Sequence, residues 1–307
     1  MLCASLFMLS GCGVQANNRH FTSEATLKIV TTIYPIQNFT EEIAGDKAEI
    51  INLVPAGMEP HDFELSTGDM QLMEEADVFI YNGAGMEHFV DKTLESVSNK
   101  DLVIVEAAQN VDLLETEHSH EGEEAHSGER NADERMDPHT WLSIENAICE
   151  AEVIKDALCE ADAENADYYN SNFDDYKTKL RALADRYEKE LAGLSKNTIV
   201  VAHEAFGYLC EEYGLIQEAV EGLTADSEPD TARMKEIIDF CRENDIQVIF
   251  FEELVSPKVA ETIADEVGAR TDVLNPIEGR SAELEAEGLD YIGLMEQNLE
   301  ALKKALK

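Results

Sequence analysis

The chain has 307 residues, of which 65 are acidic and 23 are basic, so its formal net charge is −42. This charge excludes nucleic acid as a partner, because nucleic-acid affinity comes largely from Lys and Arg side chains that neutralise phosphates. Hydrophobic residues make up 44%, which indicates globular structure, and the length suits about two domains. The acidic balance suits a surface that attracts cations, although solubility alone would also explain it.

The chain begins with a short apolar run that ends in Leu9-Ser10-Gly11-Cys12. This run is similar to a bacterial lipobox, and it is too short to span a bilayer as a helix. We therefore expect a signal peptide at 1–11, a lipid-modified Cys12 and a polar tether at 12–26. No Lys or Arg precedes Cys12, although a signal peptide should have one, and a true start upstream of Met1 would explain this. An ordinary apolar N-terminus is the alternative.

From residue 27 onward, short runs typical of strands alternate with longer helical patterns. Strands are expected at 27–34, 48–55, 77–83 and 101–107, and again at 197–203, 215–223, 246–253 and 270–276. Alternation of strands with helices favours βα units and parallel sheets. The expected fold class is therefore α/β, with an N-terminal lobe at 27–160 and a C-terminal lobe at 195–307.

A long helical pattern lies between the two lobes. Neither Gly nor Pro occurs between Ser143 and Glu190. Apolar residues recur there at spacings of three and four, which predicts one buried stripe: Tyr169, Phe173, Tyr176, Leu180, Leu183, Tyr187 and Leu191. A single helix of about 30 residues from Ala163 onward would be about 45 Å long. We expect a rigid connecting helix at 161–194.

Four cysteines, namely Cys149, Cys159, Cys210 and Cys241, lie in helical apolar patterns, and the chain has no CxxC pair. A cysteine zinc site is therefore not expected. Small buried thiols are the default for such positions, and a disulfide between two of them is left open.

Three histidines lie close to the ends of predicted elements. His61 follows a strand in GMEPHDFELS, His203 ends the strand VVAH, and His139 follows a polar loop in DPHTWL. Open α/β sheets bind their ligands beyond the carboxyl ends of their strands. Imidazole is the commonest metal ligand, and zinc sites have about four N, O or S donors. Each histidine alone would be read as a polar structural residue, but together they indicate a metal site shared by both lobes.

Five ordered motifs carry a family resemblance: VPAGMEPHDFELS, DPHTWLS, VVAHEAFGYL, EGLTADSEPD and LNPIEG. They resemble the zinc-binding, substrate-binding lipoproteins of ABC transporters, in which one long helix joins two lobes. The resemblance covers the chain from Leu27 to its C-terminus. It implies one Zn²⁺ or Mn²⁺ site in the cleft between the lobes, held by His61, His139, His203 and, in LNPIEG, Glu278.

The resemblance also implies a function and a location. The expected function is extracytoplasmic capture of Zn²⁺ and its delivery to an ABC permease, while a separate ATPase drives transport. A lipid on Cys12 would anchor the protein, expected to be a monomer, to the bacterial cell membrane. A long connecting helix resists large hinge motion, so local loop rearrangement is expected instead of wide domain closure.

The donor set bears on the choice of metal. Three imidazoles and one carboxylate suit four-coordinate Zn²⁺, whereas Mn²⁺ prefers more oxygen ligands, so zinc is favoured and manganese is the alternative. Glu59, two residues before His61, is a possible accessory oxygen donor. Asp137 is expected to orient His139, because ligating imidazoles usually donate their other N–H to a carboxylate or carbonyl. The alternative for Glu278 is a solvated loop carboxylate.

The polar segment at 115–136 contains HSHEGEEAH, with His118, His120 and His126. Its composition predicts a surface loop. Zinc-specific members of the resembled family carry a similar insert at this place, which implies an accessory loop that gathers metal near the cleft. The alternative is a solvated loop with incidental histidines.

A zinc hydrolase and an adhesin are the two rival functions. A zinc hydrolase would need an open coordination position for water, and Glu278 would close it. HEAFG begins like the metalloprotease motif HExxH, but Gly207 stands where the second histidine is required. The chain is therefore not expected to be an enzyme. An adhesin role would be secondary to metal capture.

Overall fold

The structure is a computed structural model that describes residues 19–22, 26–115, 136–223 and 229–307. The predicted signal peptide, Cys12, and the histidines His118, His120 and His126 lie outside the described residues.

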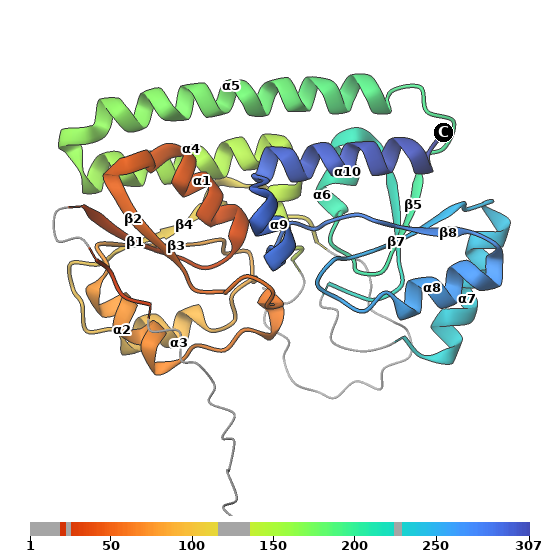
Figure 1. Ribbon diagram of the computed structural model, residues 1–307, viewed down its shortest axis with the longest axis horizontal. Coiled ribbons are helices and arrows are strands. Elements are labelled where there is room, and N and C mark those ends of the chain that lie inside the picture. The colour runs from red at the N-terminus through yellow and green to blue at the C-terminus, as the bar shows by residue number, and fades with distance from the viewer. Residues whose placement is uncertain (1–18, 23–25, 116–135, 224–228) are drawn as a thin grey trace, which may run out of the picture.

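Two four-stranded sheets form the centres of two lobes (Figure 1). The first sheet has the order β2-β1-β3-β4 and consists of β1 (Leu27–Thr31), β2 (Ala48–Asn52), β3 (Val78–Tyr81) and β4 (Val103–Glu106). The second has the order β6-β5-β7-β8 and consists of β5 (Thr198–Val201), β6 (Ile216–Ala219), β7 (Val248–Phe251) and β8 (Arg270–Val273). All pairings within them are parallel, which confirms the predicted α/β fold.

Each of the eight predicted strands is present, and each ends one to four residues earlier than predicted. The reason is that apolar residues past the last pairing continue into the core, as Ile33 and Leu53 do. Hydrophobicity reports burial, whereas the end of a strand is set by the end of its hydrogen-bonded ladder.

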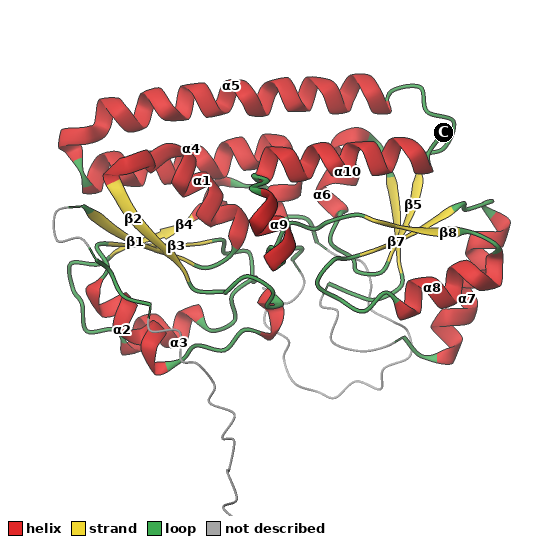
Figure 2. Cartoon of the chain, in the orientation of Figure 1, coloured by secondary structure: helices red, strands yellow, loops and turns green. Residues whose placement is uncertain are grey.

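Helices cover both faces of the sheets (Figure 2). In the first lobe these are α1 (Tyr34–Ala44), α2 (Thr67–Glu75), α3 (Val90–Ser96) and α4 (Ile144–Ala161). The second lobe contains α6 (Gly207–Tyr213), α7 (Thr231–Glu243), α8 (Lys258–Val267), α9 (Ala282–Glu287) and α10 (Tyr291–Ala305). Helices α4 and α10 lie under the long helix α5 (Ala166–Leu191), on the side opposite to α2, α3, α7 and α8.

Helix α5 is 26 residues long and runs across both lobes (Figure 1). All seven residues of the predicted apolar stripe are buried in it. The helical pattern is interrupted before it, because α4 ends at Ala161 and Ala163–Asn165 forms a 3-10 turn. The Asp162 carboxylate accepts hydrogen bonds from Asn165 and Tyr169. Such local side-chain bonds compete with a continuous helix, which explains the break.

One large hydrophobic cluster extends through the first lobe, the stripe of α5 and the adjacent part of the second lobe. A smaller cluster lies between the second sheet and helices α7 and α8. The lobes therefore share a core along α5. All four cysteines of the described residues are free thiols. No helix in the described ranges is long and apolar enough to span a bilayer.

Candidate metal site

Four predicted ligands come together between the two sheets. Imidazole nitrogens of His61, His139 and His203 and a carboxylate oxygen of Glu278 all lie within 4.8 Å of one another. His61 lies in a 3-10 turn, Pro60–Asp62, after β2, and His203 lies two residues beyond β5. Glu278 follows β8, and His139 precedes the 3-10 turn Thr140–Leu142. The site thus lies past the carboxyl ends of strands from both lobes, as expected for this class of sheet.

The four side chains are almost completely buried, with exposed fractions of 0% to 4%. Glu278 lies at the centre of the group. Its Oε1 is 3.0 Å from Nε2 of His139 and 3.7 Å from Nδ1 of His203. Its Oε2 is 3.7 Å from Nε2 of His61. A buried carboxylate surrounded by three imidazoles is the expected donor set for a divalent cation.

Several of these atoms are buried without a hydrogen bond of good geometry. They are Nε2 of His139, Nδ1 of His203 and both carboxylate oxygens of Glu278. Leaving such groups unsatisfied costs free energy unless a further partner is present. All four atoms are electron-pair donors when unprotonated, and they point at a common region. Their chemistry and placement therefore fit a divalent metal ion.

The ring of His139 is oriented by Asp137. Oδ1 of Asp137 lies 2.8 Å from Nδ1 of His139 and also accepts a hydrogen bond of 2.9 Å from the His139 backbone N–H. This contact leaves Nε2 facing Glu278. Burial lowers the pKa of His139, but hydrogen bonding to Asp137 and Glu278 outweighs burial, so the pKa is raised overall.

A residue that the sequence reasoning missed, Glu252, contacts His203. Its Oε1 lies 2.8 Å from Nδ1 of His203, while Nε2 of the same ring contacts the backbone oxygen of Leu223 at 2.7 Å. Burial lowers the pKa of His203, yet the nearby charge of Glu252 raises it to about 10. Glu252 follows β7 directly, so the strand-end rule that identified His203 could also have identified it.

Glu59, the predicted accessory donor, lies beside the group of four but is not one of its members. Burial and the adjacent charge of Glu278 raise the pKa of Glu59 to about 8. Its carboxylate accepts a long hydrogen bond of 3.4 Å from the backbone N–H of His61. Glu59 therefore contacts the segment that carries His61 from outside the cluster.

The loop that carries Glu278 belongs to the second lobe and is held by residues of the first. The backbone N–H of Tyr34 donates to the Glu278 carbonyl at 3.1 Å, and the indole N–H of Trp141 donates to the Pro276 carbonyl at 2.7 Å. Ile277 has a φ of +61°, which is strained for a β-branched residue. Strain of this kind persists only where surrounding contacts impose it, so the position of Glu278 is imposed by its neighbours.

A family model described as "Zinc-uptake complex component A periplasmic" matches residues 29–305. The chain belongs to this family. A relative from Bacillus subtilis, named high-affinity zinc uptake system protein ZnuA, is 38% identical over all of this chain and 96% of its own length. The zinc-binding lipoprotein AdcA of Streptococcus pneumoniae is 37% identical over 98% of this chain, which spans only 60% of that relative.

Solved structures show the same fold. The Zn(II)-bound ZnuA-like domain of Streptococcus pneumoniae AdcA has a TM-score of 0.78 and 36% identity, with 92% of this chain and 99% of that domain covered. The laminin-binding protein Lmb of Streptococcus agalactiae, described as having adhesin and metal transporting activity, has a TM-score of 0.79 and 28% identity. It is covered completely, again by 92% of this chain.

Proposed function

We propose that this protein captures Zn²⁺ outside the cytoplasm and delivers it to an ABC permease. The observation that carries the proposal is the convergence of four buried donors from both lobes on one point. Membership of the zinc-uptake family and the zinc-bound relative support it. Three nitrogen donors and one carboxylate favour zinc over manganese, which prefers more oxygen.

In this proposal, His61, His139, His203 and Glu278 hold the metal. Asp137 and the Leu223 carbonyl position the rings of His139 and His203 through their other nitrogens, and Glu252 adds negative charge beside His203. The role is binding without catalysis, since four protein ligands leave a tetrahedral ion no open position for an activated water. The N-terminal lobe at 27–160 and the C-terminal lobe at 195–307 each supply ligands across the connecting segment at 161–194. The protein acts as a monomer.

The test is a competition titration of metal-free protein with zinc and a chelator of known affinity. Glu278→Gln should weaken zinc binding by on the order of 100-fold or more, because one charged ligand is lost from a buried site. Glu283→Gln, which alters an exposed carboxylate five residues away in α9, should bind zinc like the wild type. Unchanged binding by Glu278→Gln would remove Glu278 from the ligand set.

We further propose that the histidine-rich segment gathers metal for the site. Deletion of 117–131 should keep one tight zinc site and remove additional weak binding, measured by calorimetry. Loss of the tight site in the deletion variant would instead place that site in the segment of His118, His120 and His126.

Membrane attachment is proposed to occur through a lipid on Cys12. The Cys12→Ser variant should leave the membrane fraction and appear in the soluble fraction of cells that express the full chain. A multiply acylated cysteine is needed for firm attachment, since one acyl chain gives only marginal binding. Continued membrane association of Cys12→Ser would contradict the proposed anchor.

A further inference from the structure

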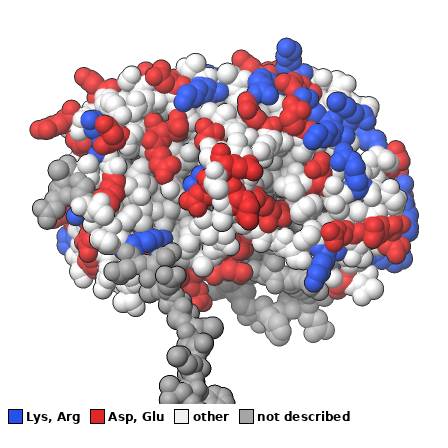
Figure 3. Space-filling view, viewed as in Figure 1, with Lys and Arg blue, Asp and Glu red and all other residues white. Residues whose placement is uncertain are grey.

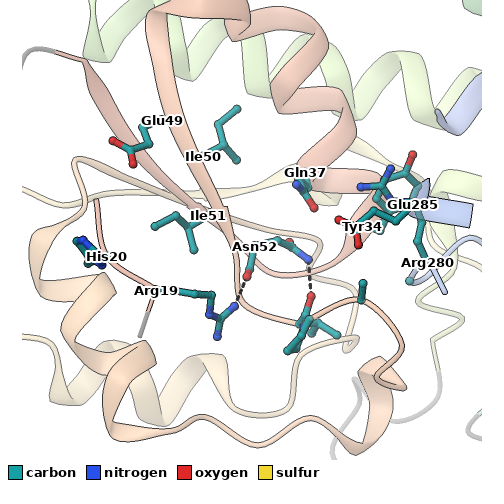
Figure 4. A pocket seen from close by; sticks show the side chains of 14 residues that line it. Arg19, His20, Tyr34, Gln37, Glu49, Ile50, Ile51, Asn52, Arg280 and Glu285 are labelled. Atoms are coloured by element: carbon teal, nitrogen blue, oxygen red, sulfur yellow. Dashed lines mark hydrogen bonds between the residues drawn. The ribbon is translucent and has the colours of Figure 1, made fainter. Parts of the chain in front are cut away.

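A cavity of about 390 Å³ lies beside the edge strand β2 of the first sheet, away from the candidate metal site (Figure 4). Edge strand β2 forms one wall, the start of α1 forms another, and the segment 279–285 closes one end. None of the four candidate metal ligands lines it. A cavity of this volume is large enough for a small organic molecule.

Arg280 and Glu285 line the same end of this cavity, together with Tyr34 (Figure 4). The guanidinium carbon of Arg280 lies 4.1 Å from the centre of the Tyr34 ring. Stacking of this kind fixes the plane of the guanidinium and leaves its donors at the edge. Arg280 is only half-buried, so the cavity is open to solvent at this point.

Neither of these opposite charges has an ion-pair partner in contact with it among the described residues. Within the described ranges, no carboxylate lies within 4.0 Å of the Arg280 guanidinium, and Glu285 forms no ion pair. Arg19, at the far end of the cavity, differs because it pairs with Asp69 and donates to the carbonyls of Asn52 and Leu53. Unlike Arg19, Arg280 therefore has no carboxylate in contact with its guanidinium among the described residues, although the charge of Glu41 acts on it from a greater distance.

The two charges, neither of which has an ion-pair partner in contact with it, define the chemistry of a ligand. A guanidinium matches a carboxylate with two parallel hydrogen bonds, and a carboxylate such as Glu285 receives an ammonium group. We propose that this cavity binds a zwitterion of the size of an α-amino acid or dipeptide, with its carboxylate on Arg280 and its ammonium on Glu285. The other acidic wall residue, Glu49, disfavours ligands with a net negative charge.

The test is calorimetric titration of the metal-free full chain with L-alanine and with diglycine. Metal-free protein is used so that chelation of zinc by the ligand does not contribute heat. Two analogues separate the contributions of the two charged groups, because N-acetylalanine lacks the ammonium and alaninamide lacks the carboxylate. Saturable binding of at least one zwitterion, and weaker binding of both analogues, is the expected result.

Arg280→Gln should weaken binding of the zwitterion at least 10-fold. Arg280→Lys should have an intermediate effect, because lysine keeps the positive charge but lacks the two parallel N–H donors of the guanidinium. Glu285→Gln should weaken the zwitterion while leaving N-acetylalanine unchanged. Arg270→Gln, which alters an arginine paired with Asp272 at the edge of the second sheet, should bind like the wild type. Thermal melts of each variant would show that it is folded.

The proposal is overturned if no zwitterion binds saturably to the wild type, or if a folded Arg280→Gln variant binds as tightly as the wild type. It is also overturned if N-acetylalanine binds as well as L-alanine, since the carboxylate alone would then account for the affinity. Because none of the metal ligands lines this cavity, these results are independent of the zinc titrations.

Discussion

Single side chains set the electrostatics of the candidate metal site. Glu278 is buried among three imidazoles. Burial alone would raise its pKa, but hydrogen bonding to His139 and the positive charge on the three rings lower the pKa overall. Asp137 supplies further negative charge behind His139, and Glu252 supplies it beside Nδ1 of His203, the nitrogen that faces Glu278. The site thus presents more carboxylate charge than its four ligands alone, which suits a divalent cation in a place that water does not reach.

At this scale, we predict that Glu252→Gln weakens zinc binding by about 10-fold to 100-fold, the range for residues that contact a metal ligand. The amide keeps the shape of the side chain but removes a charge next to His203. A chelator competition assay measures the effect, and Glu252→Asp should recover part of it. The exposed Glu236→Gln serves as the control. Wild-type affinity in Glu252→Gln would show that the contact is incidental.

At the scale of elements, α4 carries a buried acid outside the metal site. Glu150 is 0% exposed, and neither of its carboxylate oxygens has a hydrogen bond of good geometry in the described part of the chain. Burial raises the pKa of Glu150 to about 8, and the charge of Glu87 adds to the effect. The folded protein therefore keeps a proton on Glu150 at neutral pH, when the unfolded chain has released it.

The sign of the resulting pH dependence follows from linkage. The folded pKa is raised, so the stabilising effect of the proton is fully present below pH 4.5 and is lost as pH rises toward 8. We predict that Glu150→Gln is more stable than the wild type at pH 7.5, by on the order of 1–3 kcal/mol. At pH 4.5 the difference should shrink. Thermal melts of metal-free protein at both pH values measure it, and an equal shift at both would refute the account.

The packing of helix α5 against the two lobes can be tested by shortening one of its buried side chains. Leu183 is 2% exposed and belongs to the cluster that joins the lobes. Leu183→Ala should destabilise the protein by about 2–5 kcal/mol, the range for leucine cavities. Arg181→Ala, on the exposed side of the same helix, should change stability by less than about 0.5 kcal/mol. Denaturant unfolding measures both, and similar values for the two variants would mean that α5 is not packed as described.

At the scale of the whole molecule, the acidic net charge favours the approach of metal cations. The net charge is −42, and acidic side chains are spread across the visible face while Lys and Arg gather mainly toward the end of the second lobe (Figure 3). Such a field attracts cations from a distance.

The shared core along α5 and the hydrogen bonds of Trp141 and Tyr34 to the loop of Glu278 resist wide opening of the lobes. Loop rearrangement is the expected route for metal exchange.

The charge leads to a kinetic prediction. The rate constant for zinc association should fall by about 10-fold or more between low and high ionic strength, because salt screens the long-range field. Trp141 is the only tryptophan, and its ring centre lies 5.5 Å from that of His139. Its fluorescence in a stopped-flow instrument reports binding. An association rate that does not depend on salt would exclude electrostatic steering.

Local periodicity in the sequence was enough to predict part of this structure. The eight strands, the apolar stripe from Tyr169 to Leu191 and the placement of His61 and His203 past strand ends follow from patterns of a few residues. Family motifs added Glu278. These features were predictable because the spacing of apolar residues and the end of a strand are both visible within a single segment of the sequence.

The pairing of charges depends on the folded arrangement of the chain and could not be predicted from local patterns. The contact of Glu252 with His203, the burial of Glu150 and the cavity that Arg280 and Glu285 line depend on residues far apart in the chain. The break at Asp162 lies close to the predicted start of the connecting helix, and the hydrogen bonds of Asp162 interrupt a helical pattern that has no Gly or Pro. With 65 acidic residues in the chain, composition cannot say which carboxylates are buried, since burial is set by long-range packing.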